Sequence, residues 1–284
     1  MGNAKDDKPG KMLTSMREAG SAIVVTGAGG GIGSGLVRRL IGDGWRVLAV
    51  DLNRDGLAKL QSERSVGARL DVFTLDVSRP GDVERTARQI DDQGIAVAGL
   101  VNAAGILQDV VPFMSLDIER QRQIWDVNYF GAFYCTKWFG NLMIKNGGGS
   151  IVNITSINEL RVLPLHAYGP TKVAMGSLTT LTAGEFGAKS VRVNSVAPGF
   201  TLTPAMQEKI DSGKRDVSAL KRATAMRRLV EIDEVASVVS FLMSDESSAV
   251  TGVSIPVDAG WLTTSHWMNF GDLLATGSEE KPGS

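Results

Sequence analysis

The sequence has little cysteine, little histidine and almost no net charge. A single cysteine, Cys135, rules out an internal disulfide, and with two histidines the paired Cys/His spacing of zinc sites is absent. Lys and Arg number 30 against 31 Asp and Glu, so the net charge is −1. Such a chain has no overall basic field to attract nucleic acid or an anionic membrane surface. We therefore expect no metal site and no nucleic-acid partner.

Long apolar runs and extra proline are also missing. No stretch of about 18 or more apolar residues occurs, so we expect no membrane span. The first residues, MGNAKDDKPGK, lack the apolar region of a secretory signal, which predicts a cytoplasmic protein. Glycine is abundant instead, at 33 of 284 residues, and 43% of the residues are hydrophobic. This composition is typical of a globular protein with many tight turns and close backbone approaches.

Short apolar runs rich in β-branched residues alternate with helical patterns between residues 21 and 258. The strand-like runs cover residues 21–27, 46–50, 69–75, 98–103, 150–155, 191–196 and 252–257, and the clearest helical patterns cover 32–43, 117–145, 167–187 and 231–243. This alternation predicts an α/β fold, a single Rossmann-type, doubly wound domain with a seven-stranded parallel sheet. We expect the domain over residues 21–260, a mobile N-terminal arm over 1–20 with a short helix near 12–18, and a C-terminal extension over 261–284.

A glycine-rich turn, TGAGGGIG at residues 26–33, joins the first predicted strand to a helix. The start of a helix offers free N–H groups and a positive dipole end, which bind a pyrophosphate, and glycines let it approach. The alternative is an ordinary tight turn. The strand before and the helix after favour cofactor binding by Gly27, Gly31, Ile32 and Gly33.

Acidic residues end the second and third predicted strands. Asp51 lies 18 residues after Gly33, where a carboxylate accepts hydrogen bonds from ribose hydroxyls and repels a 2′-phosphate. The turn holds no basic residue, so we expect NAD rather than NADP, although Arg54 lies close by. Asp76, with Val77, is expected to border the adenine. Either aspartate could instead be a cap or turn residue.

Three further segments resemble those of the short-chain dehydrogenases/reductases. They are NAAG at residues 102–105, YGPTK at 168–172 and PGFTLT at 198–203, and with the glycine turn they extend the resemblance over residues 20–261. The resemblance implies cofactor contacts by Asn102, Gly105 and Thr203. It also implies a catalytic group, which consists of Asn128, Ser156, Tyr168 and Lys172.

The chemistry of these residue types agrees with that implication. Tyr168 and Lys172 are four residues apart on a predicted helix and so share one face. A phenol has a pKa of ~10, and lowering it by about 3 units requires roughly 4 kcal/mol. An ammonium about 4–5 Å away supplies about 4 kcal/mol at an effective dielectric of 20. By the resemblance, Ser156 holds the substrate oxygen, Asn128 anchors a water, and Tyr168 and Lys172 also contact the cofactor.

The segment between the catalytic serine and tyrosine departs from the family pattern. Glu159 stands where glycine is common, and we expect it to face the pocket. Pro170 is tolerated only in a first helical turn, so the helix should begin close to Ala167. His166 either lines the pocket or is an ordinary loop residue. The basic residues between 207 and 231 either favour an acidic substrate or form a solvated helix face.

These observations predict an NAD-dependent oxidoreductase acting on a small-molecule secondary alcohol, such as a polyol, a cyclic alcohol or a diol. A faint likeness of NAAGILQ, residues 102–108, to dihydrodiol dehydrogenases would favour a cyclic diol. The alternative is a non-catalytic NAD-binding sensor or scaffold on the same fold. Aromatic residues point in nearly every direction around the helix at residues 125–143, so this helix should be covered on its outer face as well as on the face that meets the sheet. We expect another subunit to cover it in a homotetramer, with the segment 261–274 near a neighbouring subunit.

Overall fold

The computed structural model describes residues 11–267, which form seven parallel strands with helices on both faces. The strands are β1 (Ala22–Thr26), β2 (Arg46–Asp51), β3 (Leu70–Thr74), β4 (Val97–Asn102), β5 (Gly149–Ile154), β6 (Val191–Pro198) and β7 (Ser254–Val257). Their order is β3-β2-β1-β4-β5-β6-β7, with every neighbouring pair parallel. The seven-stranded parallel sheet is therefore confirmed. The strand order reverses between β1 and β4, where such folds bind ligands.

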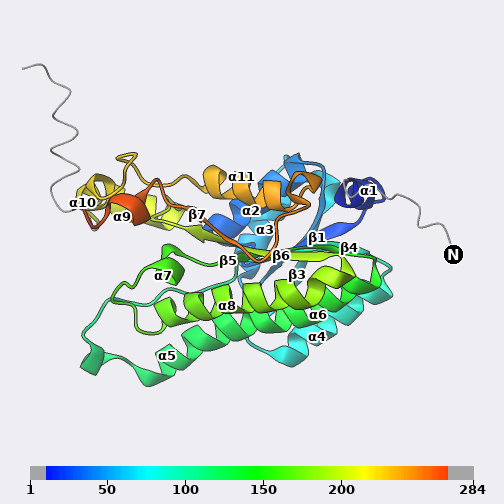
Figure 1. The fold of residues 1–284 in the computed structure, drawn as a ribbon, viewed down its shortest axis with the longest axis horizontal. Coiled ribbons are helices and arrows are strands. Elements are labelled where there is room, and N and C mark those ends of the chain that lie inside the picture. The colour runs from blue at the N-terminus through cyan, green and yellow to red at the C-terminus, as the bar shows by residue number, and fades with distance from the viewer. Residues whose placement is uncertain (1–10, 268–284) are drawn as a thin grey trace, which may run out of the picture.

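Two groups of helices cover the sheet (Figure 1). One face carries α1 (Met12–Glu18), α2 (Gly31–Gly42), α3 (Arg54–Ser62) and α11 (Ile232–Leu242). The other carries α4 (Pro80–Asp92), α5 (Ile118–Trp125), α6 (Gly131–Lys145) and α8 (Tyr168–Phe186). The short helices α7 (Ile157–Leu160), α9 (Pro204–Asp211), α10 (Ser218–Arg222) and α12 (Trp261–Thr264) lie toward one end of the sheet. None of the helices in residues 11–267 has the length and apolarity to cross a membrane.

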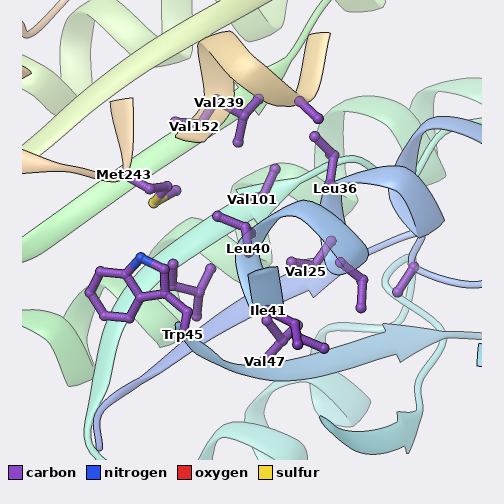
Figure 2. Close-up of a cluster of buried hydrophobic side chains, with 14 of the residues drawn as sticks. Val25, Leu36, Leu40, Ile41, Trp45, Val47, Val101, Val152, Val239 and Met243 are labelled. Atoms are coloured by element: carbon purple, nitrogen blue, oxygen red, sulfur yellow. The ribbon is translucent and has the colours of Figure 1, made fainter. Parts of the chain in front are cut away.

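The strands are buried on both faces, because alternate side chains point to opposite sides. Val25, Val47 and Val101 belong to the cluster under α2 and α11, which Figure 2 shows together with Leu40 and Met243. The intervening residues Val24, Leu48 and Leu100 belong to a second cluster, which contains the fully buried Phe139 of α6. This two-sided packing holds the carboxyl ends of the strands at one edge, where the site residues lie.

The N-terminal segment forms the short helix expected near residues 12–18, but this helix packs on the domain instead of belonging to a mobile arm. These residues form α1, and its Leu13 is buried in the core beneath α2. The carboxylate of Asp245 accepts hydrogen bonds from the backbone N–H groups of Leu13 (2.9 Å) and Thr14 (2.8 Å). A distant carboxylate thus caps the helix start, which the polar sequence of the segment did not reveal. The remainder of the arm, residues 1–10, lies outside the described residues.

Candidate active site

The glycine-rich turn connects β1 to α2, and two of its glycines are required by the turn itself. Gly27 has φ +68°, and a Cβ there would lie 2.7 Å from the backbone of Ala104. A Cβ on Gly33 would overlap the carbonyl oxygen of Gly27. The hydroxyl of Thr26 accepts hydrogen bonds from the N–H groups of Ala103 and Ala104, both 3.1 Å long, which ties the turn to the NAAG segment after β4.

The start of α2 fits the phosphates of a dinucleotide. Its N-cap is Gly30, no side chain caps it, and its first turn holds no acidic residue. The first N–H groups of the helix, from Gly31 to Gly33, are therefore available to an anion. A Cβ on Gly31 would lie 3.2 Å from Cγ2 of Thr203, so the PGFTLT segment adjoins this helix start. Gly31, Ile32, Gly33 and Thr203 thus surround one spot, as expected, and their contacts with a cofactor stay a prediction.

The carboxylate of Asp51 closes the other side of the turn. One oxygen accepts from the N–H of Gly29 and the other from the N–H of Asn53, each at 2.8 Å. Each carboxylate oxygen has a second lone pair that remains available to a ribose hydroxyl. Arg54 is exposed at the start of α3. The position of Asp51 therefore fits an adenosine ribose.

Asp76 makes local contacts that favour the alternative of a turn residue. One of its oxygens accepts from the backbone N–H (3.0 Å) and the hydroxyl (2.6 Å) of Ser78, and the other lies 3.3 Å from Nε of Arg79. Val77 is buried against Gly131 at the start of α6. Contacts of either residue with an adenine stay a prediction.

Asn102 directs its side chain into the core. Its amide donates to the hydroxyl of Thr136 (3.1 Å) and to the carbonyl of Asn153 (2.8 Å), whose own amide donates to Thr179 (2.8 Å). This buried network ties β4 and β5 to α6 and α8. We expect any contact of Asn102 with a cofactor to come through its backbone.

The four residues of the expected catalytic group come from three different parts of the chain. Ser156 follows β5 and is the N-cap of α7, Tyr168 is the first residue of α8, and Lys172 lies one turn later. Nζ of Lys172 lies 5.5 Å from the centroid of the Tyr168 ring and donates to the carbonyl of Ile154 (2.8 Å). The Ser156 hydroxyl lies near enough to the phenol of Tyr168 to lower the pKa of the tyrosine. The fold therefore brings the serine, tyrosine and lysine together.

Asn128 lies behind this group in an irregular part of its helix. The expected continuous helix over residues 117–145 contains a π-helical turn, Asp126–Phe130, between α5 and α6. Such turns are frequent at functional sites. The side chain of Asn128 accepts from the N–H of Ile106 (2.8 Å) and donates to its carbonyl (3.1 Å). A Cβ on Gly105 would lie 3.4 Å from Oδ1 of Asn128 and 3.8 Å from Nζ of Lys172, so Gly105 lies between these two side chains. By binding Ile106, Asn128 holds the NAAG segment beside the lysine.

Burial shifts the pKa values of both Tyr168 and Lys172. Burial raises the pKa of Tyr168 above its ordinary value, and the hydrogen bond from Ser156 offsets part of that rise. Burial also lowers the pKa of Lys172 to about 8, although the negative charge of Glu159 opposes this. The sequence argument considered the ammonium alone, and the expected lowering of the tyrosine pKa is not seen, because removing the phenolate from water costs more.

Two polar residues that the sequence argument did not single out bind residues of the expected catalytic group. Gln108 is buried, and its carbonyl accepts from the N–H groups of Ala167 (2.7 Å) and Tyr168 (3.2 Å), so it caps the start of α8. Asn158 donates to Oγ of Ser156 through its side chain (3.1 Å) and its backbone N–H (3.2 Å). Asn158 was recognisable from its position two residues after the serine, whereas Gln108 lies 60 residues before Tyr168.

The segment between Ser156 and Tyr168 shows mixed outcomes. Helix α8 begins at Tyr168, which places Pro170 in its first turn, as predicted. His166 is exposed and meets the ring of Phe113 edge-on, with centroids 5.1 Å apart. The expectation that Glu159 faces the pocket is not met, because its carboxylate lies against Gly176 of α8 and accepts from Ser254 (3.0 Å).

The start of the C-terminal extension packs on its own chain. Trp261 is buried, and its ring meets that of Phe200 in the PGFTLT segment, with centroids 5.7 Å apart. The guanidinium of Arg161 lies 5.9 Å from the centroid of the Trp261 ring and donates to Ser265 (3.0 Å). The expected packing of the segment 261–274 near another subunit lies partly outside the described residues.

The profile of a protein family described as Enoyl-(Acyl carrier protein) reductase matches residues 27–262, which include every motif above except Thr26, the first residue of the glycine turn. The chain belongs to the short-chain dehydrogenase/reductase family. A 2,5-dichloro-2,5-cyclohexadiene-1,4-diol dehydrogenase of Sphingobium indicum is 32% identical over 86% of this chain and 97% of the relative. A galactitol 2-dehydrogenase of Rhizobium johnstonii is 33% identical over 85% of this chain and 95% of the relative. The structure described as ElxO with NADP bound is 27% identical with a TM-score of 0.80, over 86% of this chain and 99% of the other.

These similarities confirm the expected family and show an oxidoreductase that uses a nicotinamide cofactor. This short-chain dehydrogenase/reductase keeps the serine, tyrosine and lysine together at the carboxyl edge of its sheet, beside the uncapped start of α2.

Proposed function

We propose that this short-chain dehydrogenase/reductase transfers a hydride between a secondary alcohol and NAD, with Tyr168 as the general acid/base. The observation that carries the proposal is the Ser156–Tyr168–Lys172 arrangement: the serine hydroxyl lowers the pKa of the phenol, and the lysine Nζ lies 5.5 Å from the centroid of its ring. The alcohol we propose is a polyol, a cyclic alcohol or a diol. The names of the two relatives above, one acting on a cyclic diol and one on galactitol, support this class.

Ser156 is prepared to donate its own proton. Its Oγ already accepts two hydrogen bonds from Asn158, so the remaining favourable partner for its hydroxyl hydrogen is an oxygen. The Tyr168 phenol, whose pKa the Ser156 hydroxyl lowers, is one oxygen within its reach, and the substrate oxygen would take this place during the reaction. Ser156 thereby holds the alcohol oxygen next to the phenol that takes its proton.

Tyr168 and Lys172 handle the proton of the substrate hydroxyl. During oxidation the phenolate removes that proton from the oxygen as a hydride leaves the carbon that bears the hydroxyl, and a bound nicotinamide would accept the hydride. The Lys172 ammonium stabilises the phenolate, and the positive charge of the oxidised ring adds to this effect. Burial raises the pKa of Tyr168, so more of the phenolate forms as the pH rises. Alcohol oxidation should therefore become faster with rising pH, up to the pH at which Lys172 loses its proton.

We propose NAD as the cofactor because Asp51 ends β2 beside the glycine turn, where its charge would repel a 2′-phosphate. The uncapped start of α2 would hold the pyrophosphate. The structure described as ElxO with NADP bound has the same fold, so the fold alone does not select the cofactor. We therefore attribute the preference for NAD to the charge of Asp51.

The test is the Tyr168→Phe variant, assayed by NADH absorbance with NAD and a panel of polyols, cyclic alcohols and diols. We expect loss of turnover while NAD affinity stays within about threefold, because the ring remains and the proton acceptor is lost. Turnover above a tenth of wild type would refute the assignment. A wild-type protein that binds NAD tightly but oxidises no member of the panel, and reduces none of the matching ketones, would favour a non-catalytic sensor.

A further inference from the structure

The side chain of Glu159 lies across α8 close to the catalytic pair. Glu159 belongs to α7, three residues after Ser156. Gly176 provides the room for it, since a Cβ there would overlap Oε1 and would lie 2.6 Å from Cδ and 3.0 Å from Cγ of Glu159. The carboxylate therefore rests directly on the helix that carries Tyr168 and Lys172.

The opposite side of the carboxylate is fixed by β7. Oε2 of Glu159 accepts a hydrogen bond from the hydroxyl of Ser254 (3.0 Å). Tyr168, Lys172 and Gly176 follow one another at intervals of four residues, so they lie in a row along one face of α8. The Glu159 carboxylate lies over Gly176, one helical turn beyond Lys172, and so places a negative charge on the same face of α8 as the lysine.

Among residues 11–267, Lys172 has no other carboxylate to balance its charge. It is buried, and its Nζ contacts the Ile154 carbonyl of β5 and, at 3.6 Å, the sulfur of Met175. Among the described residues, Glu159 is the one acidic group whose charge acts on it, and this charge opposes the effect of burial.

The other charged and titratable groups near this part of the sheet have partners of their own. Arg161, after α7, contacts Ser265 and Trp261, whereas Arg192 of β6 donates to the carbonyls of Leu242 and Ser244. Asp258, after β7, accepts from the N–H groups of Gly260 and Leu262. Asn128 of the π-helical turn, which donates to the hydroxyl of Thr171 in α8 (3.4 Å), is neutral.

We propose that Glu159 is a positioning residue that keeps Lys172 in its ammonium form and thereby sets the pH range over which Tyr168 exchanges protons with the substrate. This inference rests on the proposed function, because it acts through the same tyrosine and lysine. Taking Lys172 out of water favours the neutral amine, which would give the phenolate no support. The half-buried carboxylate of Glu159 acts in the opposite direction and favours the charged form of the lysine.

The decisive variant is Glu159→Gln, which keeps the size of the side chain and an oxygen that accepts from Ser254 but removes the charge. We expect the pH profile of kcat to become narrower. Its alkaline limit should fall by about 0.5–1 pH unit, since the lysine loses its proton earlier. Its acid limit should not rise, because the lysine is still charged there and removing a negative charge does not hinder ionisation of the phenol. Glu159→Asp should recover part of the wild-type profile.

Glu185→Gln is the matched control, because Glu185 is an exposed glutamate near the other end of α8. We expect its pH profile to match that of the wild type. A Glu159→Gln profile that coincides with that of the wild type, or that is lowered equally at every pH, would refute the proposal, since a merely structural role predicts the latter.

A second measurement does not depend on turnover. In protein with 13C-labelled lysine, the Lys172 signal is identified by its loss in Lys172→Met, and its titration is followed by NMR. The midpoint should move down by about 0.5–1 pH unit in Glu159→Gln. An unchanged midpoint would overturn the inference. A shifted midpoint in a protein without dehydrogenase activity would support it while refuting the proposed function.

Discussion

Gly176→Ala should destabilise the protein even though it places a better helix former inside α8. Alanine in a helix interior is normally favoured over glycine by about 0.5–1 kcal/mol. Here the new Cβ would overlap the Glu159 carboxylate and lie 2.6 Å from its Cδ, so the side chain would have to swing away. It would then lose its hydrogen bond from Ser254, and a hydrogen bond to a charged group is worth about 1.5–3 kcal/mol.

The expected result follows from these two opposing terms. In the wild-type background, Gly176→Ala should lower the free energy of unfolding by about 0.5–2.5 kcal/mol, the difference between loss and gain. In a Glu159→Ala background there is no carboxylate to displace, so the same substitution should raise that free energy by about 0.5–1 kcal/mol. The coupling between the two sites is then about 1.5–3 kcal/mol.

The assay is urea unfolding of the four proteins at pH 7 and one protein concentration, with the midpoint and slope of each transition compared. Gly176→Ala should also narrow the pH profile of kcat as Glu159→Gln does, because the displaced carboxylate moves away from Lys172. The reasoning is refuted if Gly176→Ala stabilises both backgrounds equally, since the space at Gly176 would then not be needed by Glu159.

Three further outcomes are expected. NAD should be preferred over NADP by at least about 10-fold in kcat/KM, or roughly 1.4 kcal/mol, and Asp51→Ala should narrow this gap; steady-state kinetics showing an NADP preference in the wild type would contradict the role of Asp51. Burial would raise the pKa of Asp245, but hydrogen bonds from Thr14 and Leu13 outweigh it and hold the pKa below its ordinary value. The stabilisation by Asp245 is therefore present above the unfolded-state pKa of ~3.9 and is lost as the pH falls through the lower folded-state value. Asp245→Asn should lower the free energy of unfolding by about 0.5–1 kcal/mol at neutral pH and leave it unchanged near pH 2, as measured by denaturant unfolding. Apolar side chains are exposed on the outer faces of α6 and α8, such as Phe133 (40% exposed) and Leu181 (70% exposed), which favours contact with other subunits there. Light scattering at micromolar concentration should therefore give four times the mass of the 30.2 kDa chain. A stable monomer would refute the tetramer.

The sequence by itself determined those features that depend on residues close together in the chain. The alternation of β-branched runs and helical patterns was sufficient for the seven-stranded parallel sheet, because burial on both faces produces that pattern. The glycine turn was recognisable because Gly27 needs φ +68° and Gly33 must lie against the Gly27 carbonyl. The spacing of Tyr168 and Lys172 placed both on one helical face, and Pro170 located the start of that helix.

Only the tertiary structure decided the contacts between distant residues and the effects of burial. Gln108 caps the start of α8 from 60 residues away, and Asp245 caps α1 from the opposite end of the chain. The side chain of Asn102 enters a buried amide network instead of the expected site, because its partners Thr136 and Asn153 come from other elements. The pKa of Tyr168 rises where a count of nearby charges predicted a fall, and Glu159 turns to α8 rather than to the pocket. Desolvation and contacts across the fold depend on which elements pack together, and no local spacing of residues contains that information.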